Sequence, residues 1–224
     1  MCGRFTLRSP IDSIASLFPG LELPTYKPRF NIAPTQPVAC LRNVDGQRSI
    51  SMLRWGLVPS WASNLEMGAP MINARAETVA SKPSFRGAFQ DRRCLVLADG
   101  FFEWKQVGKK KYPFYVARPD GQPFCMAGLW ETWGTAETFV ETCAIITTIA
   151  SQTLTPLHSR MPVILSLDQS RFWLDAGARE SARLQGLLQP AVEQELVMRE
   201  VSQVVNNVAN DSPACIEPEA TLFD

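Results

Sequence analysis

The sequence predicts an α+β fold whose strands pair mainly in antiparallel fashion. Three observations favour it: strand patterns outnumber helical ones, two strand pairs flank short turn signals, and strands do not alternate regularly with helices as a doubly wound parallel sheet requires. The 224 residues slightly exceed the usual size of one domain, and no linker or repeat divides them. We therefore expect one domain spanning residues 1–224.

The first expected element is a short helix near the N-terminus. Ser9-Pro10 supplies an N-cap and a proline at the first helical position, and apolar residues follow at helical spacing up to Phe18. Pro19-Gly20 then ends the helix.

Strand patterns dominate the chain after this helix. Asp45-Gly46 and a Gly-Lys-Lys-Lys tip each separate two strand patterns and predict two hairpins. The predicted strands cover residues 38–41, 50–55, 101–106, 112–117, 124–129, 139–148 and 161–166. The predicted helices cover residues 84–90, 151–157, 168–174 and 183–188. We expect the tail from residue 206 onward to be irregular.

Composition excludes several classes of protein. Hydrophobic residues make up 46% and charged residues 20% of the chain, which is typical of a packed soluble protein and not of a disordered one. The N-terminus lacks a signal-peptide pattern, and no apolar run approaches the roughly 20 residues that span a bilayer. We therefore expect a cytoplasmic protein without membrane contact. The six cysteines are widely spaced, so we expect no disulfide, no metal site and no cofactor.

The zero net charge hides an uneven distribution along the chain. Residues 1–112 contain 16 Lys and Arg against 8 Asp and Glu, whereas residues 113–224 contain 6 against 14. This asymmetry is compatible with a polyanion-binding face built by the first half, and equally with two halves that pair their charges across the fold.

Cys2 is the first candidate nucleophile. Cytosolic processing removes Met1 when the second residue is small, which leaves a cysteine with a free α-amine beside its thiol. Reference pKa values near 8 for the amine and 8.5 for the thiol keep both reactive near neutral pH. An aldehyde meeting this pair forms a Schiff base, which the thiol closes into a thiazolidine ring. The alternative is that Cys2 is an incidental small residue at a disordered start.

Two further candidates concern proton transfer. His158 is the only histidine and lies between a helical pattern and a strand pattern, so any imidazole chemistry must use it; the alternative is a structural hydrogen-bonding residue. Glu103 lies in an aromatic strand pattern, where Phe101 and Lys105 share its face. Desolvation beside aromatic rings suits a carboxylate to proton transfer near pH 7, whereas the alternative is a solvent-facing glutamate paired with Lys105.

The remaining candidates suit nucleic acid. Asn73, Arg75 and Glu77 share one face if their segment is extended, and an amide beside a guanidinium suits a sugar and its phosphate. Single-stranded DNA is held by cations along its backbone and by aromatic rings that stack on bases. Further residues of these types are Arg4, Arg160, Trp55 and Trp61, although we expect at least one of the two tryptophans to lie in the core.

Six motifs, in this order, resemble the SRAP family, the SOS-response-associated peptidases understood as abasic-site processing proteins. They are Met1-Cys2-Gly3-Arg4-Phe5, Arg29-Phe30-Asn31-Ile32-Ala33-Pro34, Arg54-Trp55-Gly56-Leu57-Val58-Pro59, Ile72-Asn73-Ala74-Arg75-Ala76-Glu77, Asp99-Gly100-Phe101-Phe102-Glu103-Trp104 and His158-Ser159-Arg160-Met161-Pro162. The resemblance covers nearly the whole chain.

The resemblance implies a mixed fold with a β-barrel-like core, short peripheral helices and a positively charged channel for single-stranded DNA. It assigns the nucleophile that crosslinks to abasic sites to Cys2, with an associated lyase activity. The implied roles are catalysis for Asn73, Glu103 and His158, phosphate contacts for Arg4, Arg75 and Arg160, and DNA contacts for the loops carrying Asn31, Pro34, Trp55 and Trp61. It also implies a monomer that associates with the nucleoid when DNA is damaged.

Two rival functions stay open on the sequence. One is a cysteine peptidase that uses Cys2 and His158 and removes Met1 autocatalytically. The other is a single-stranded DNA-binding module in which Cys2 is inert.

Overall fold

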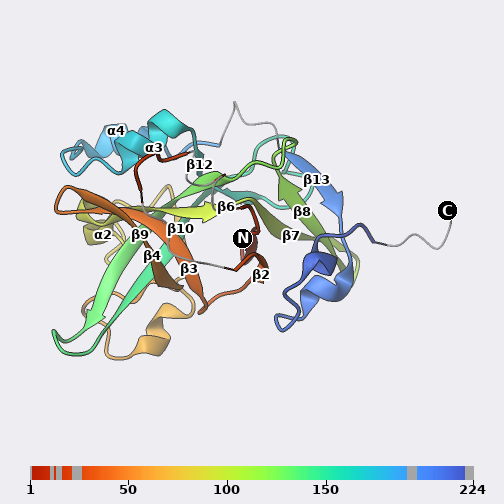
Figure 1. The fold of residues 1–224 in the computed structure, drawn as a ribbon, viewed down its shortest axis with the longest axis horizontal. Coiled ribbons are helices and arrows are strands. Elements are labelled where there is room, and N and C mark those ends of the chain that lie inside the picture. Colours follow the sequence, from red (N-terminus) through yellow and green to blue (C-terminus); the bar gives the residue numbers. More distant parts are fainter. Residues whose placement is uncertain (1, 11–12, 14–16, 22–26, 191–195, 220–224) are drawn as a thin grey trace.

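The computed structural model describes residues 2–10, 13, 17–21, 27–190 and 196–219, and the strands within these ranges form two sheets (Figure 1). The five-stranded sheet has the order β13-β8-β7-β1-β2. Its strands are β1 (Arg4–Leu7), β2 (Arg29–Ile32), β7 (Gly100–Val107), β8 (Lys110–Ala117) and β13 (Val197–Glu200). All of its pairings are antiparallel.

The larger sheet closes into a five-stranded barrel. Neighbouring strands follow the order β10-β4-β3-β6-β9, and β9 pairs back onto β10. These strands are β3 (Pro37–Val44), β4 (Gln47–Trp55), β6 (Arg93–Ala98), β9 (Phe124–Gly134) and β10 (Phe139–Ile149). Only the contact between β10 and β4 is parallel within this ring. The expected α+β fold with a mainly antiparallel, barrel-like core is therefore confirmed.

Three short strands extend the barrel wall. β5 (Asn73–Arg75) pairs in parallel with β10, β11 (Arg160–Pro162) pairs with β10, and β12 (Ile164–Leu165) pairs with β9. The strand predicted over residues 161–166 is thus divided at Val163. The backbone N–H of Val163 donates to Ile146 and its carbonyl accepts from Ala127, so the chain crosses there from β10 to β9.

The two predicted hairpins are confirmed. Asp45 and Gly46 have φ values of 52° and 83° and form the turn between β3 and β4, as the residue types indicate. Gly108 lies at the tip between β7 and β8 with φ 60°. Sequence patterns did not identify β1, β2, β6 and β13. For β5, the sequence indicated only which side chains would share a face if the segment around Asn73 and Arg75 were extended.

Three of the expected helices are present with shifted ends. They are α2 (Arg86–Asp91), α3 (Leu167–Trp173) and α4 (Ser181–Gly186). Ser166 and Gln169 form a capping box at the start of α3. The helix predicted over residues 9–18 falls largely on positions 11–12 and 14–16, which lie outside the described residues. None of the helices that the structure describes is long and apolar enough to cross a membrane.

The prediction of a helix over residues 151–157 is wrong. This segment is a series of turns in which Leu154 donates to Ser151 and Leu157 donates to Leu154. Pro156 has no backbone N–H and therefore interrupts a continuous i to i−4 ladder.

The five-stranded sheet separates two hydrophobic clusters. Phe101 faces the main cluster of the barrel, whereas its neighbour Phe102 faces a smaller cluster that includes Val205 and Cys215 from the C-terminal segment. The tail from residue 206 onward was expected to be irregular. Within the described residues it contains one 3₁₀ turn, η3 (Pro213–Cys215), and a second, η2 (Gln203–Asn206), ends at its first residue. Both turns pack against the outer face of the sheet.

Candidate functional site

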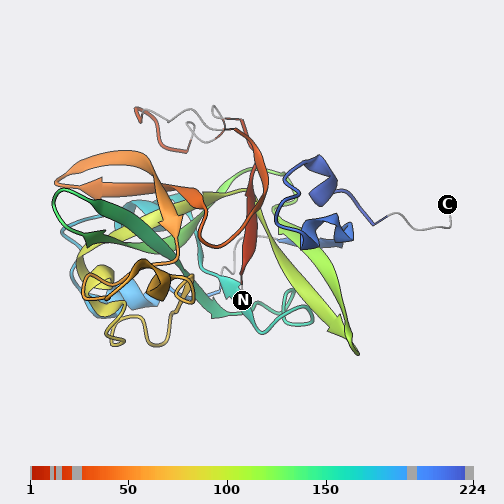
Figure 2. The same ribbon diagram turned by 90° about the horizontal axis from the view of Figure 1, so that it is seen from below.

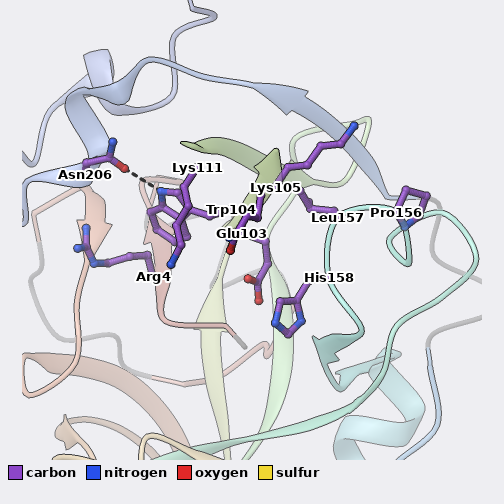
Figure 3. A pocket seen from close by; sticks show the side chains of 10 residues that line it. Arg4, Glu103, Trp104, Lys105, Lys111, Pro156, Leu157, His158 and Asn206 are labelled. Atoms are coloured by element: carbon purple, nitrogen blue, oxygen red, sulfur yellow. Dashed lines mark hydrogen bonds between the residues drawn. The ribbon is translucent and has the colours of Figure 1, made fainter. Parts of the chain in front are cut away.

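A pocket of about 680 Å³ opens where β7 continues past the end of β1. The pairing of these strands ends with Arg4 opposite Phe102. The lining residues, whose side chains are drawn in Figure 3, are Arg4, Glu103, Trp104, Lys105, Gln106, Lys111, Pro156, Leu157, His158 and Asn206. The pocket therefore joins the N-terminal strand, the β7–β8 hairpin, the loop before β11 and the C-terminal segment.

Cys2 is buried beside this pocket, two residues before β1. The side-chain amide of Asn73 donates to the Cys2 carbonyl oxygen at 2.9 Å, so β5 fixes the position of the N-terminal backbone. Burial, and after it the negative charge of Glu103, raises the pKa of the Cys2 thiol well above its usual range. The thiol is therefore protonated at neutral pH in a chain that retains Met1.

Glu103 on β7 and His158 in the loop before β11 both line the pocket. Figure 3 shows the Glu103 carboxylate turned toward the His158 ring. Glu103 is only 5% exposed, which excludes a solvent-facing glutamate. His158 Nδ1 lies 2.9 Å from the backbone nitrogen of Arg160 and 3.2 Å from the Arg160 carbonyl oxygen, so the backbone of Arg160 fixes the position of the ring. The fold thus brings a carboxylate and an imidazole together at one pocket. Carboxylates and imidazoles both donate and accept protons in enzymes, so the pair suits proton transfer.

Arg4 and Asn31 connect the pocket to the C-terminal segment. Arg4 donates to Asn31 Oδ1 at 2.7 Å and to the Val205 carbonyl oxygen at 2.9 Å. Asn31 is fully buried, and its amide nitrogen donates to the carbonyl oxygens of Val205, Asn207 and Asn210. Asn31 therefore holds the C-terminal segment in place and offers no surface to DNA, whereas Arg4 forms part of the pocket wall.

The two other arginines expected on phosphates differ in their surroundings. Arg160 forms a two-point ion pair with Glu77, at 2.6 and 3.0 Å, which neutralises its charge. Arg75 is exposed on β5, on the same face as Asn73, and within the described residues it has no ion pair. β5 ends at Arg75, so Glu77 lies beyond the strand instead of on a shared extended face. Arg75 is consequently the better placed phosphate ligand.

Trp55 and Trp61 lie in opposite environments. Trp55 is fully buried, packs edge-on against Phe5 at 5.1 Å and donates from Nε1 to the Ile72 carbonyl oxygen. It lies in the core, as expected for at least one of the pair, and has no face for a base. Trp61 is 60% exposed and can stack on one. Pro34 is half-buried in the loop after β2.

Several lining residues were not predicted. Trp104 donates from Nε1 to Asn206 Oδ1 at 2.7 Å, which joins β7 to the C-terminal segment. Lys105 and Lys111 were recognisable as hairpin residues, but no sequence signal indicated that Asn206 reaches the site. Among the described residues, no group of three or more His, Cys, Asp or Glu side chains is arranged to hold a metal ion.

A family model described as SOS response associated peptidase (SRAP) matches residues 1–208. The chain belongs to the SRAP family. Among relatives in that family, the abasic site processing protein YoqW of Bacillus subtilis is 40% identical, over 97% of this chain and 99% of its own length. The abasic site processing protein YedK of Escherichia coli is 34% identical over 97% of this chain and all of its own. The abasic site processing protein HMCES of Gallus gallus is 32% identical over 86% and 67%, respectively.

Solved structures share the fold of this chain. A protein from Bacteroides thetaiotaomicron superposes with a TM-score of 0.87 at 24% identity, covering 98% of this chain and all of that one. A phage-related protein from Bordetella bronchiseptica gives a TM-score of 0.72 at 28% identity, covering 90% of this chain and 95% of that one.

Proposed function

We propose that this protein processes abasic sites in single-stranded DNA by joining the aldehyde of the open sugar to Cys2 after Met1 is removed. The observation that carries the proposal is the position of Cys2. Its backbone is held by Asn73 beside a pocket lined by Glu103 and His158. Relatives over nearly the whole chain are called abasic site processing proteins, which supports DNA carrying this lesion as the substrate.

The proposed chemistry forms two bonds to one carbon. The α-amine of Cys2 attacks the sugar aldehyde, and loss of water gives an imine. The thiol then adds to the imine carbon while a proton moves to nitrogen, which closes a thiazolidine ring. No oxidant or reductant is needed. If the imine instead loses a proton from the adjacent carbon, β-elimination cuts the strand, so a lyase activity belongs to the same site.

Each neighbouring side chain has a distinct role in this sequence. His158 supplies a proton that helps the closed sugar open to its aldehyde, and Glu103 transfers protons at the amine as water leaves. Asn73 holds the Cys2 backbone in place through its carbonyl oxygen. Arg75 binds phosphate, and Trp61 stacks on a neighbouring base.

In the chain that retains Met1, the raised pKa of the Cys2 thiol counts against a cysteine peptidase that removes Met1 itself. A peptidase needs Cys2 as a thiolate, but burial and the charge of Glu103 both favour the protonated thiol. In the aldehyde reaction the amine attacks first, so a neutral thiol is no obstacle to the initial step.

The deciding experiment uses single-stranded DNA with one natural abasic site. Incubated with the protein lacking Met1, this DNA is expected to stay attached through denaturing electrophoresis. An analogue whose sugar has no aldehyde should bind but form no adduct. Binding of the aldehyde-bearing DNA without any adduct would instead identify a DNA-binding module with an inert Cys2.

Glu103→Gln is expected to slow adduct formation by about 10²- to 10⁴-fold, because it keeps the shape of the side chain and removes its proton transfer. The rate is measured by quenching the reaction at intervals and separating the adduct. Affinity for undamaged single-stranded DNA should change less than about twofold.

Glu131→Gln is a matched control for this substitution. Glu131 is also a buried glutamate, but it lies on β9 and pairs with Arg92 away from the pocket. Its variant should react at the wild-type rate. If Glu103→Gln loses DNA affinity in proportion to its rate, Glu103 has a structural role.

A further inference from the structure

The β7–β8 hairpin carries a concentration of positive charge that extends beyond the pocket. Between Gly100 and Ala117 the chain contains four lysines and a single acidic residue, Glu103, which is buried at the pocket. The lysines are all exposed, and they are Lys105, Lys109, Lys110 and Lys111.

These four charges are not neutralised by the fold. Elsewhere, arginines on the barrel form ion pairs, as Arg42 does with Glu141 and Arg92 with Glu131. Within the part of the chain that the structure describes, none of the four hairpin lysines lies within ion-pair distance of a carboxylate. Their full charge is therefore available to a ligand.

The lysines form a track that leads away from the site. Lys105 and Lys111 line the pocket, while Lys110 pairs with Val107 at the end of the hairpin. Figure 2 shows the tip of the hairpin projecting beyond the rest of the five-stranded sheet and away from the barrel. Val107 lies four positions after Glu103 along β7, so at about 3.4 Å per residue the tip lies roughly 14 Å from Glu103.

We propose that the tip of this hairpin is a DNA-binding arm, in which Lys109 and Lys110 bind phosphates of the strand that leaves the pocket. The inference rests on the proposed function, since it assumes that single-stranded DNA enters the pocket. The strand that leaves the pocket must therefore extend about 14 Å beyond Glu103 to reach the tip. The tip has no aromatic side chain, so the arm binds the backbone as a row of charges and reads no base.

The test compares undamaged oligonucleotides of about 3 and about 20 nucleotides. The shorter one is too short to occupy the pocket and reach the tip at the same time, whereas the longer one reaches both. Wild type should bind the longer one more tightly. Lys109→Ala/Lys110→Ala is expected to lose roughly tenfold in affinity for the longer DNA at low salt. Its log–log salt dependence should become shallower by about 1.4, or about 0.7 for each lost phosphate contact. Affinity for the short oligonucleotide should stay at the wild-type value.

Arg48→Ala/Arg86→Ala is the matched control. It removes the same charge from exposed residues of the β3–β4 hairpin and α2, which lie at the opposite end of the molecule from the arm (Figure 1). This variant should bind both oligonucleotides as wild type does.

Two outcomes would contradict the proposal that the hairpin tip binds DNA. One is wild-type affinity of the lysine variant for the longer DNA, and the other is an equal loss for both lengths. These measurements use undamaged DNA and do not depend on adduct formation. Failure of wild type to crosslink abasic DNA would therefore reject the proposed function without being mistaken for failure of the arm.

Discussion

A chain that keeps Met1, or carries a tag directly before Cys2, is expected to form no adduct with abasic DNA and to cut no strand. The preceding residue converts the α-amine of Cys2 into an amide, and an amide nitrogen cannot form an imine. The thiol is still present, so a mechanism that uses only the thiol would be unaffected. Crosslinking and strand cleavage are measured on denaturing gels, with binding to undamaged DNA as evidence that the blocked protein is folded.

Cys2→Ala separates the two nucleophiles. After removal of Met1 this variant has a free amine and no thiol, so it should lose the stable thiazolidine and keep the imine. Borohydride, which reduces the imine, should then trap a covalent complex that is absent without the reductant. A stable adduct formed by the blocked chain would contradict the aminothiol mechanism and require a nucleophile that acts through sulfur alone.

The parts of the fold that the sequence predicts are those with local signals. Asp45-Gly46 and the tip at Gly108 fix their hairpins because positive φ values require particular residue types. β6 has no such signal, since it is buried along its whole length and lacks the alternation of a half-exposed strand. Barrel closure depends on pairing between β9 and β10 and between β10 and β4, and these contacts join segments that no turn signal links.

The residues of the candidate site also fall into those that a local sequence signal identifies and those that depend on tertiary contacts. Residues at the start of the chain and within motifs were identified because unusual chemistry marks them, as with the terminal Cys2 and the single histidine. Charge alone did not show which arginines are free to bind phosphate. Arg160 forms its ion pair with Glu77 because β11 and β5 both pair with β10, which the sequence does not indicate. The contribution of Asn206 was unpredictable, since it depends on tertiary packing of the C-terminal segment against Trp104.

The largest loss of stability is expected at Asp99, which holds the far end of the strand that begins near Cys2. Asp99 is fully buried, and its carboxylate accepts hydrogen bonds from the Thr6 hydroxyl at 2.5 Å and the backbone N–H groups of Arg8 and Ser9 at 2.6 Å each. The Ser9 hydroxyl donates to it at 2.8 Å. These bonds fix the end of β1 to the strand β7, which starts at the next residue.

The absence of a side chain at Gly100 allows Tyr115 to reach the Thr6 hydroxyl and join this network. The Tyr115 hydroxyl lies 2.9 Å from the Thr6 hydroxyl, and the Tyr115 ring crosses directly over Gly100. A Cβ atom at Gly100 would lie 2.1 Å from the Tyr115 hydroxyl oxygen, so only glycine permits this arrangement. The Asp99-Gly100 pair in the motif therefore has a structural explanation that is separate from Glu103.

Asp99→Ala is expected to lower the free energy of unfolding by about 3–5 kcal/mol, because it leaves buried backbone N–H groups and hydroxyls without an acceptor. Asp99→Asn should cost less, since its amide oxygen still accepts from some of these donors. Asp91→Ala is the control: Asp91 forms an exposed ion pair with Arg179, which is worth at most about 1 kcal/mol. Urea unfolding measures all three. If Asp99→Ala unfolds within about 1 kcal/mol of wild type, this network does not anchor β1, and the position of Cys2 must instead depend on its contact with Asn73.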